Sequence, residues 1–226
     1  LSKSSNASQL YENFVGSLLD KNKKRFVALV FQETHLLEEK EIKNLWMTSS
    51  ITNDPIFAEI LIAKNIGNNE ENRQLAVEAA IDFGSFHVFK HLFCGCETKI
   101  NQKITTKAMI SSNKSIQLSF ISRAKKDLLE AAYTNDIETF RILTPFAIID
   151  VNTKDKKGKT PLMIASKKGN TEIVKFLLLE SRVDINLADN ERYTALGYAK
   201  QQNQHDIVAL LSERGAQTER FSPFSF

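Results

Sequence analysis

The sequence has few cysteines, few glycines and no long apolar run. Its 226 residues include two Cys, eight Gly and four Pro. Two cysteines are too few for a disulfide framework and favour a reducing, cytosolic compartment. Eight glycines leave little for glycine-rich phosphate loops. No apolar run approaches the roughly 18 residues that a membrane span requires. The chain also starts without the charged and apolar blocks of a secretory signal, and without Met, which suggests a fragment.

An excess of charge of one sign is also missing. The formal net charge is +3, with 42% hydrophobic and 25% charged residues. These values are ordinary for a soluble globular protein, and the charge is too small to indicate nucleic-acid binding. Any electrostatic function must therefore be local. The sequence lacks the G-x-S-x-G, G-x-x-x-x-G-K-[ST] and G-x-G-x-x-G motifs, so no enzymatic activity and no cofactor are expected.

What the sequence does contain is an internal repeat. The segments that begin DKKGKTPLMIASKKGN at Asp155 and DNERYTALGYAKQQNQ at Asp189 align at an offset of 34 residues, and Ala131 matches Ala165 at the same offset. The shared pattern is T-P-L-x-x-A, then G-x-x-E-I-V-x-x-L-L, then D-[VI]-N. In this pattern and period the chain resembles the ankyrin-repeat family.

The motif residues also have local physical reasons. Gly158 supplies the positive φ of a tight turn, and Thr160 followed by Pro161 is an N-cap followed by a first-turn proline. Gly169 ends that helix, and Glu172 favours the first turn of the next. Each unit is therefore predicted to be a turn, a short helix, a second helix and an extended connector. Such a unit buries its apolar face only by stacking on neighbours.

The repeats become degenerate upstream. Ser49–Ser50, Ala79–Ala80 and Gly84 mark weaker copies, and a short helix pair is expected before a new helix near Lys126. The predicted fold class is all-α, an ankyrin-type helical solenoid of about seven stacked helix pairs with short turn connectors. The predicted domains are a flexible segment 1–9, degenerate ankyrin-like repeats 10–126, clear ankyrin repeats 127–218 and a tail or linker 219–226.

Ankyrin proteins meet their partners through the turn tips and the flank of the first helix, which line a concave groove. The resemblance therefore implies a binding surface with a basic middle and a tyrosine on either side. An acidic protein partner is expected, and Lys175 and Arg182 are assigned to the opposite surface. Solubility alone is the alternative role for these lysines. The predicted partner-binding residues are Lys156, Lys157, Lys159, Lys167, Lys168, Tyr133, Asn190, Glu191, Tyr193, Gln201 and Gln202.

A second cluster has the residue types of a zinc site, namely His87, His91, Cys94 and Cys96. The segment HVFKHLFCGC lacks the glutamate of an H-E-x-x-H motif. The repeat alignment gives these residues a packing role: His87 falls at an exposed position, His91 at a buried leucine position, and the thiols in a connector. Packing is favoured over metal binding.

The predicted function is that of a cytoplasmic protein-interaction scaffold without activity of its own. One alternative is a targeting module of a larger enzyme whose catalytic domain lies outside these residues. Degenerate arrays of this kind also resemble effectors that intracellular bacteria deliver into the host cytosol. Nucleic acid or anionic lipid is a less favoured ligand, because no aromatic stacking platform for bases is evident. The oligomeric state is left open.

Overall fold

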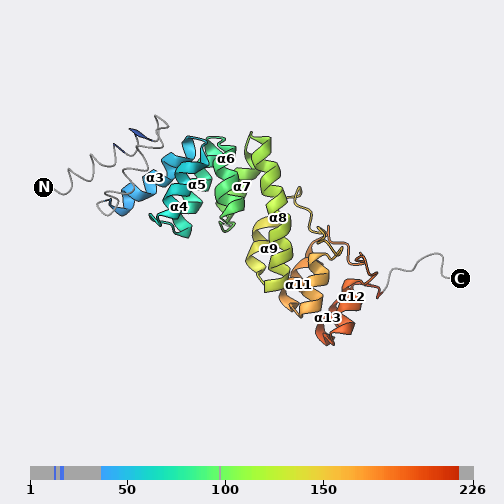
Figure 1. Ribbon diagram of the computed structural model, residues 1–226. Helices are drawn as coiled ribbons and strands as arrows, with labels where there is room; N and C mark the ends of the chain where they lie inside the picture. The colour runs from blue at the N-terminus through green and yellow to red at the C-terminus, as the bar shows by residue number, and fades with distance from the viewer. Residues whose placement is uncertain (1–12, 14–15, 18–36, 97, 219–226) are drawn as a thin grey trace. The chain divides into compact units, whose positions relative to one another are not determined.

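A computed structural model describes residues 13, 16–17, 37–96 and 98–218 (Figure 1). The chain divides into two compact units, unit 1 (Leu1–Phe120) and unit 2 (Ile121–Phe226). The division falls within one helix, α8 (Lys114–Thr134). The described residues form helices joined by turns and contain no β-strand, so the all-α prediction is confirmed for them. None of the helices in these ranges is long and apolar enough to cross a membrane.

Unit 1 is a stack of helices in which α3 packs on α5, α5 on α7, and α4 on α6. Its core is aromatic. The Trp46 indole Nε1–H donates to the carbonyl oxygen of Ile66 at 2.9 Å, and the Phe93 ring stacks on both Phe89 and Phe120. The helical segments of this unit are α3 (Glu39–Ile51), α4 (Pro55–Ala63), α5 (Glu70–Asp82), α6 (Phe86–Phe89), the π-helix η2 (Lys90–Gly95), α7 (Gln102–Ile110) and the start of α8.

Unit 2 repeats the same arrangement, with α10 packed on α12 and α11 on α13. Ala165 and Ala199, 34 residues apart, are fully buried, as expected for small residues between close helices. The helices are the end of α8, α9 (Ile137–Leu143), α10 (Pro161–Lys168), α11 (Thr171–Leu179), α12 (Ala195–Gln201) and α13 (His205–Glu213).

The turn between the two helices of a pair uses a left-handed residue in both units. A positive φ is strained for most side chains and easiest for glycine and asparagine. The positions are Asn53, Gly84, Asn135, Gly169 and Asn203, with φ between 52° and 81°. The first helices also begin alike, because Asn69, Asn101, Thr160 and Thr194 each accept a hydrogen bond from a backbone N–H of the first turn. These signals extend the repeat pattern into unit 1.

The two units differ in the connector between pairs. In unit 1, six residues join α4 to α5 (64–69) and six join η2 to α7 (96–101). In unit 2, seventeen residues join α9 to α10 (144–160) and fifteen join α11 to α12 (180–194). Long connectors with turn tips therefore belong to unit 2.

Two further predictions concern the helix near Lys126 and the ends of the chain. The break expected before a new helix near Lys126 is absent, because α8 continues from Lys114 to Thr134 as one helix. The first part of the degenerate repeats predicted from residue 10 onward lies almost wholly outside the described residues, and residues 1–9 and 219–226 lie outside them entirely. The number of about seven pairs is accordingly not confirmed.

Candidate partner-binding surface

The turn tips of unit 2 are fixed by a repeated aspartate. Asp155 Oδ1 accepts hydrogen bonds from the backbone N–H groups of Lys157 and Lys159, each at 2.8 Å. Asp189 Oδ1 does the same for Glu191 at 3.0 Å and Tyr193 at 2.9 Å. The tips therefore project their lysine, glutamate and tyrosine side chains from a closed backbone turn.

Neighbouring tips are joined through Asn190. Its backbone N–H donates to the carbonyl oxygen of Lys157 at 3.0 Å, and its Nδ2 donates to that of Lys156 at 3.3 Å. Asn190 is exposed, but its amide is already used within the protein.

Tyr198, which was not among the predicted site residues, lies at the centre of this surface. It belongs to α12 and is 2% exposed. Its hydroxyl donates to Asp189 Oδ2 at 2.5 Å. Burial and this bond to a carboxylate raise the pKa of the Tyr198 hydroxyl well above its ordinary value, so it stays protonated. The only available signal in the sequence was its spacing, three residues before Gln201 on the same helix.

Three lysines lie against tyrosine rings. The Nζ atoms of Lys159 and Lys167 lie 4.7 Å and 5.1 Å from the centroid of the Tyr198 ring. Lys168 Nζ lies 3.7 Å from the centroid of the Tyr133 ring. The ring of Tyr193 lies 5.4 Å from that of Tyr198. We call these six residues, Tyr133, Lys159, Lys167, Lys168, Tyr193 and Tyr198, the lysine–tyrosine face.

A cation above an aromatic ring is held by the electrostatic field of the ring, by about 0.5–1 kcal/mol at exposed sites. Lys168 also lowers the pKa of the exposed Tyr133 hydroxyl, first as its hydrogen-bond partner and second through its charge. The lysine–tyrosine face thus presents ammonium groups in defined positions.

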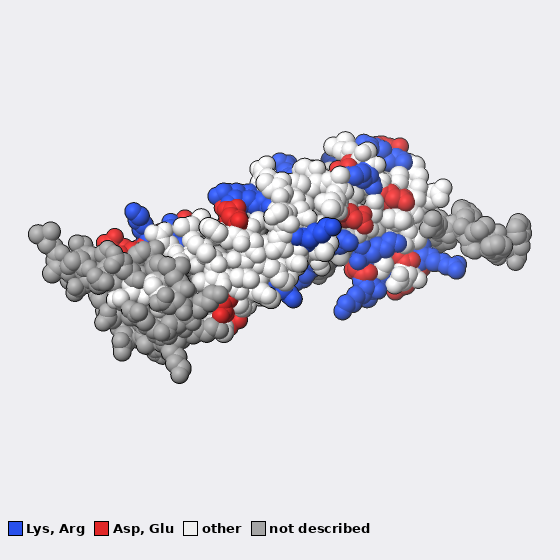
Figure 2. Space-filling model, turned by 90° about the horizontal axis from the view of Figure 1, so that it is seen from above, with Lys and Arg blue, Asp and Glu red and all other residues white. Residues whose placement is uncertain are grey.

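None of the five predicted lysines forms an ion pair within the described part of the chain. Lysines of unit 1, by contrast, do form ion pairs. Lys43 lies 2.8 Å from Glu71, and Lys103 lies 2.5 Å from the nearly buried Glu78. On the face that Figure 2 shows, acidic side chains also lie among the basic ones of the C-terminal part.

Of the predicted binding residues, all but Lys159 are exposed. The tip residues Lys156, Lys157 and Glu191 are exposed, as are Gln201 and Gln202 at the end of α12. Lys159 is half-buried, whereas Lys167 and Lys168 are exposed at the end of α10. Tyr133 is 59% exposed and Tyr193 is 37% exposed.

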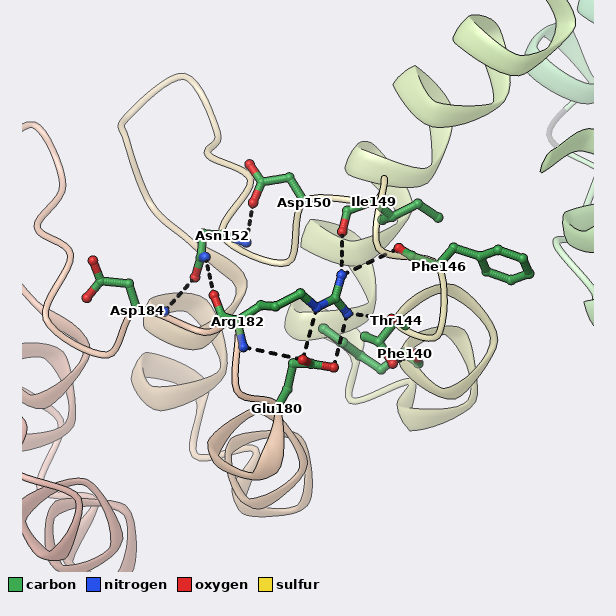
Figure 3. A network of polar contacts seen from close by, with 9 residues as sticks. All are labelled: Phe140, Thr144, Phe146, Ile149, Asp150, Asn152, Glu180, Arg182 and Asp184. Carbon is green, nitrogen blue, oxygen red and sulfur yellow. Dashed lines mark hydrogen bonds and ion pairs between the residues drawn. The ribbon is translucent and has the colours of Figure 1, made fainter.

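Arg182, which the sequence assigned to the opposite surface, has a structural role. It lies in the connector after α11, and its guanidinium donates to the carbonyl oxygens of Thr144 at 2.5 Å and Ile149 at 3.3 Å (Figure 3). Glu180 holds it through two bonds, from Nε to Oε1 and from Nη2 to Oε2, each 3.0 Å. Arg182 is therefore a structural residue that joins two successive connectors.

The D-x-N motif also joins successive parts of the chain. Asp150 Oδ1 accepts from the backbone N–H of Asn152 at 2.9 Å. Asn152 Oδ1 in turn accepts from the N–H of Asp184 at 2.9 Å (Figure 3). In the next repeat, Asn186 Oδ1 accepts from the N–H of Gln217 at 2.8 Å. The asparagine of each motif thus contacts the following stretch of chain.

The histidine–cysteine cluster lies in unit 1. His87 and Cys94 are exposed, while His91 and Cys96 are half-buried, so the expected burial of His91 is wrong. Cys94 lies within η2 and not in a connector. His91 Nδ1 lies 3.5 Å from Glu59 Oε1, and His91 Nε2 lies 3.8 Å from Cys96 Sγ. Burial raises the pKa of the Cys96 thiol. In the ranges described, no three His, Cys, Asp or Glu residues are placed to hold a metal ion.

Comparison with known proteins agrees with this geometry. Residues 128–222 match the family model of ankyrin repeats, with three copies. No curated protein was found to match the chain. The matched range coincides with the helix pairs that carry long connectors and turn tips. Ankyrin repeats are generally protein–protein interaction modules and are typically non-catalytic. Residues 128–222 of this chain belong to the ankyrin-repeat family.

Proposed function

We propose that unit 2 is a scaffold that binds a protein partner with an acidic surface, and that the lysine–tyrosine face makes the contact. The observation that carries this proposal is the position of Lys159, Lys167 and Lys168. Their ammonium groups lie on tyrosine rings and form no ion pair with the carboxylates that the structure describes. A role in solubility alone does not require the ammonium groups to be held in defined positions.

The tip residues extend the proposed contact surface. Lys156, Lys157 and Glu191 are exposed beside the Asn190 contacts, and Gln201 and Gln202 lie at the far end of α12. Tyrosine supplies contact area with little loss of side-chain entropy, and charge complementarity mainly increases the association rate. The partner is therefore expected to bring both carboxylates and apolar groups.

Footprinting tests this assignment. The partner is first obtained by affinity capture with the full chain as bait. Hydrogen exchange and lysine acetylation of the complex are then compared with those of the free chain. Protection at Lys159, Lys167 and Lys168, with none at Lys175 on α11, supports the proposal. Protection confined to α9, α11 and α13 would assign the contact to the second helices and contradict it.

A further inference from the structure

Two ammonium groups converge on one aromatic ring. Lys159 lies just before α10, and Lys167 lies in its last turn, yet both side chains reach the ring of Tyr198 on the neighbouring helix α12. Since both Nζ atoms lie within 5.1 Å of the same centroid, they are at most about 10 Å apart, which is one Debye length at 0.1 M salt. At this separation the two positive charges repel each other.

The ring beneath them is held in place. The Tyr198 hydroxyl is bonded to Asp189, which is 7% exposed and also accepts two backbone N–H groups. The oxygens of this carboxylate are thus committed to the turn and to the tyrosine. Tyr193 lies beside Tyr198 and adds a second, partly exposed ring at the edge of the pair.

Among the described residues of unit 2, no carboxylate forms an ion pair with either lysine. The exposed carboxylate of Glu191, whose charge acts on the Tyr198 hydroxyl, forms an ion pair with neither lysine. Within the described residues, these two like charges are therefore brought close together without an ion pair that neutralises either of them. An arrangement of this kind is stabilised by an external anion that contacts both groups.

We infer that Lys159 and Lys167 above Tyr198 form a binding site for a doubly charged anionic group of the partner. This inference rests on the proposed function and specifies the group that is bound. A phosphorylated side chain or two adjacent carboxylates supplies that charge, because two negative charges interact with both ammonium groups at once. A single carboxylate carries only one negative charge and neutralises only one of the two ammonium groups. Lysine binds phosphate as a point charge, so no planar fork is needed.

Lys168 is not part of this site. Its ammonium group lies on Tyr133, at the end of α8, and not on Tyr198. The adjacent residues Lys167 and Lys168 therefore point to different rings on opposite sides of α10. Substitution of Lys168 consequently provides a control for charge on the same face.

The site is tested first with inorganic phosphate and acetate, titrated into the full chain at pH 8 and constant ionic strength and followed by NMR. Phosphate, which is doubly charged at this pH, is expected to shift resonances of Lys159, Lys167 and the Tyr198 ring. Acetate is expected to bind at least fivefold more weakly. The double variant Lys159→Gln/Lys167→Gln should weaken phosphate binding about five- to tenfold, and Lys157→Gln/Lys168→Gln less than twofold. Equal binding of both anions, or equal losses in both variants, would overturn the inference.

Short peptides then distinguish the two sources of charge. Peptides carrying one phosphoserine, two adjacent aspartates or one aspartate are compared in the same titration. Preference for either of the first two over the third supports the site and identifies its source, whereas equal binding of all three overturns it. Failure of these titrations, together with loss of partner binding on substitution of the lysines, would refute only the doubly charged site. A functional phosphate site without any effect on partner binding would contradict the proposed function instead.

Discussion

The backbone N–H of Asn190 donates a hydrogen bond of 3.0 Å to the carbonyl oxygen of Lys157, one repeat away. This contact sets the spacing of two turn tips, and it requires that nothing protrude between them. Gly158 meets that requirement, because a Cβ atom there would lie 2.5 Å from Asn190 Oδ1 and 3.0 Å from its backbone nitrogen. The glycine is thus needed for close approach as well as for its φ of 81°.

Gly158→Ala is therefore expected to destabilise unit 2 by more than the strain of a positive φ alone, by about 2–3 kcal/mol in total. Gly215→Ala is the matched control, since Gly215 has a φ of 74° and nothing within 4 Å of the added Cβ atom. Urea unfolding followed by far-UV circular dichroism measures both. Fluorescence of Trp46, the single tryptophan, reports unit 1 and should not change. Equal losses in the two variants would show that the tip contact is unimportant.

Tyr198→Phe should destabilise unit 2 at neutral pH by about 1–3 kcal/mol, because the buried carboxylate of Asp189 loses a hydrogen-bond donor. The raised pKa of Tyr198 adds a pH dependence. The folded protein keeps the proton when the unfolded chain releases it, at about pH 10. This contribution is present below pH 10 and is lost as pH rises above it. The difference in stability between wild type and variant should therefore shrink between about pH 10 and pH 11. A constant difference would contradict the buried bond.

Arg182→Gln should destabilise unit 2 by about 1–3 kcal/mol, because backbone carbonyl oxygens lose a charged donor. Lys175→Gln, on exposed α11 surface, should change the stability by less than about 0.5 kcal/mol. Arg182→Lys should restore only part of the loss, since an ammonium group cannot make the two parallel bonds to Glu180. Full recovery with lysine would indicate that charge alone matters.

The same pair predicts an acid dependence. The Arg182 bond lowers the pKa of Glu180 below its ordinary value. Its contribution is therefore present above the unfolded pKa, about 4.3, and is lost as pH falls through the lower folded value. The deficit of Arg182→Gln relative to wild type should shrink below about pH 4, as measured by urea unfolding at pH 7 and pH 3. An unchanged deficit would show that Arg182 acts without Glu180.

Local signals in the sequence were sufficient to predict the helix pairs of unit 2. Gly158, Thr160 and Pro161 each have a conformational preference that specifies one position in a turn or a first helix, and the structure places them there. The continuity of α8 was missed because the repeat pattern implied a boundary before Lys126. Residues 114–134 contain no glycine or proline, and no connector separates the two parts, so the local signals favoured the single helix that the structure shows.

The binding surface was predictable only in part. Exposure of Lys167, Lys168 and Tyr133 follows from their place in the repeat. The role of Tyr198 depends on a contact with Asp189 and on Lys159 and Lys167 of the preceding repeat. Such side-chain contacts have no local sequence signal. The structural role of Arg182 could not be predicted for the same reason, since its partners Thr144 and Ile149 lie more than 30 residues earlier in the chain.

The most direct test of the central claim is the affinity for the captured partner at about 50 mM and 200 mM salt, where screening differs strongly. The triple variant Lys159→Gln/Lys167→Gln/Lys168→Gln is compared with wild type and with Lys125→Gln/Arg141→Gln/Lys175→Gln, which removes the same charge from exposed positions elsewhere in unit 2. We expect the first variant to lose at least tenfold in affinity at low salt, mainly through a slower association rate, and to lose most of the salt dependence. The second should stay within about threefold of wild type. Equal losses in both variants, or a wild-type affinity that does not depend on salt, would contradict binding through the lysine–tyrosine face.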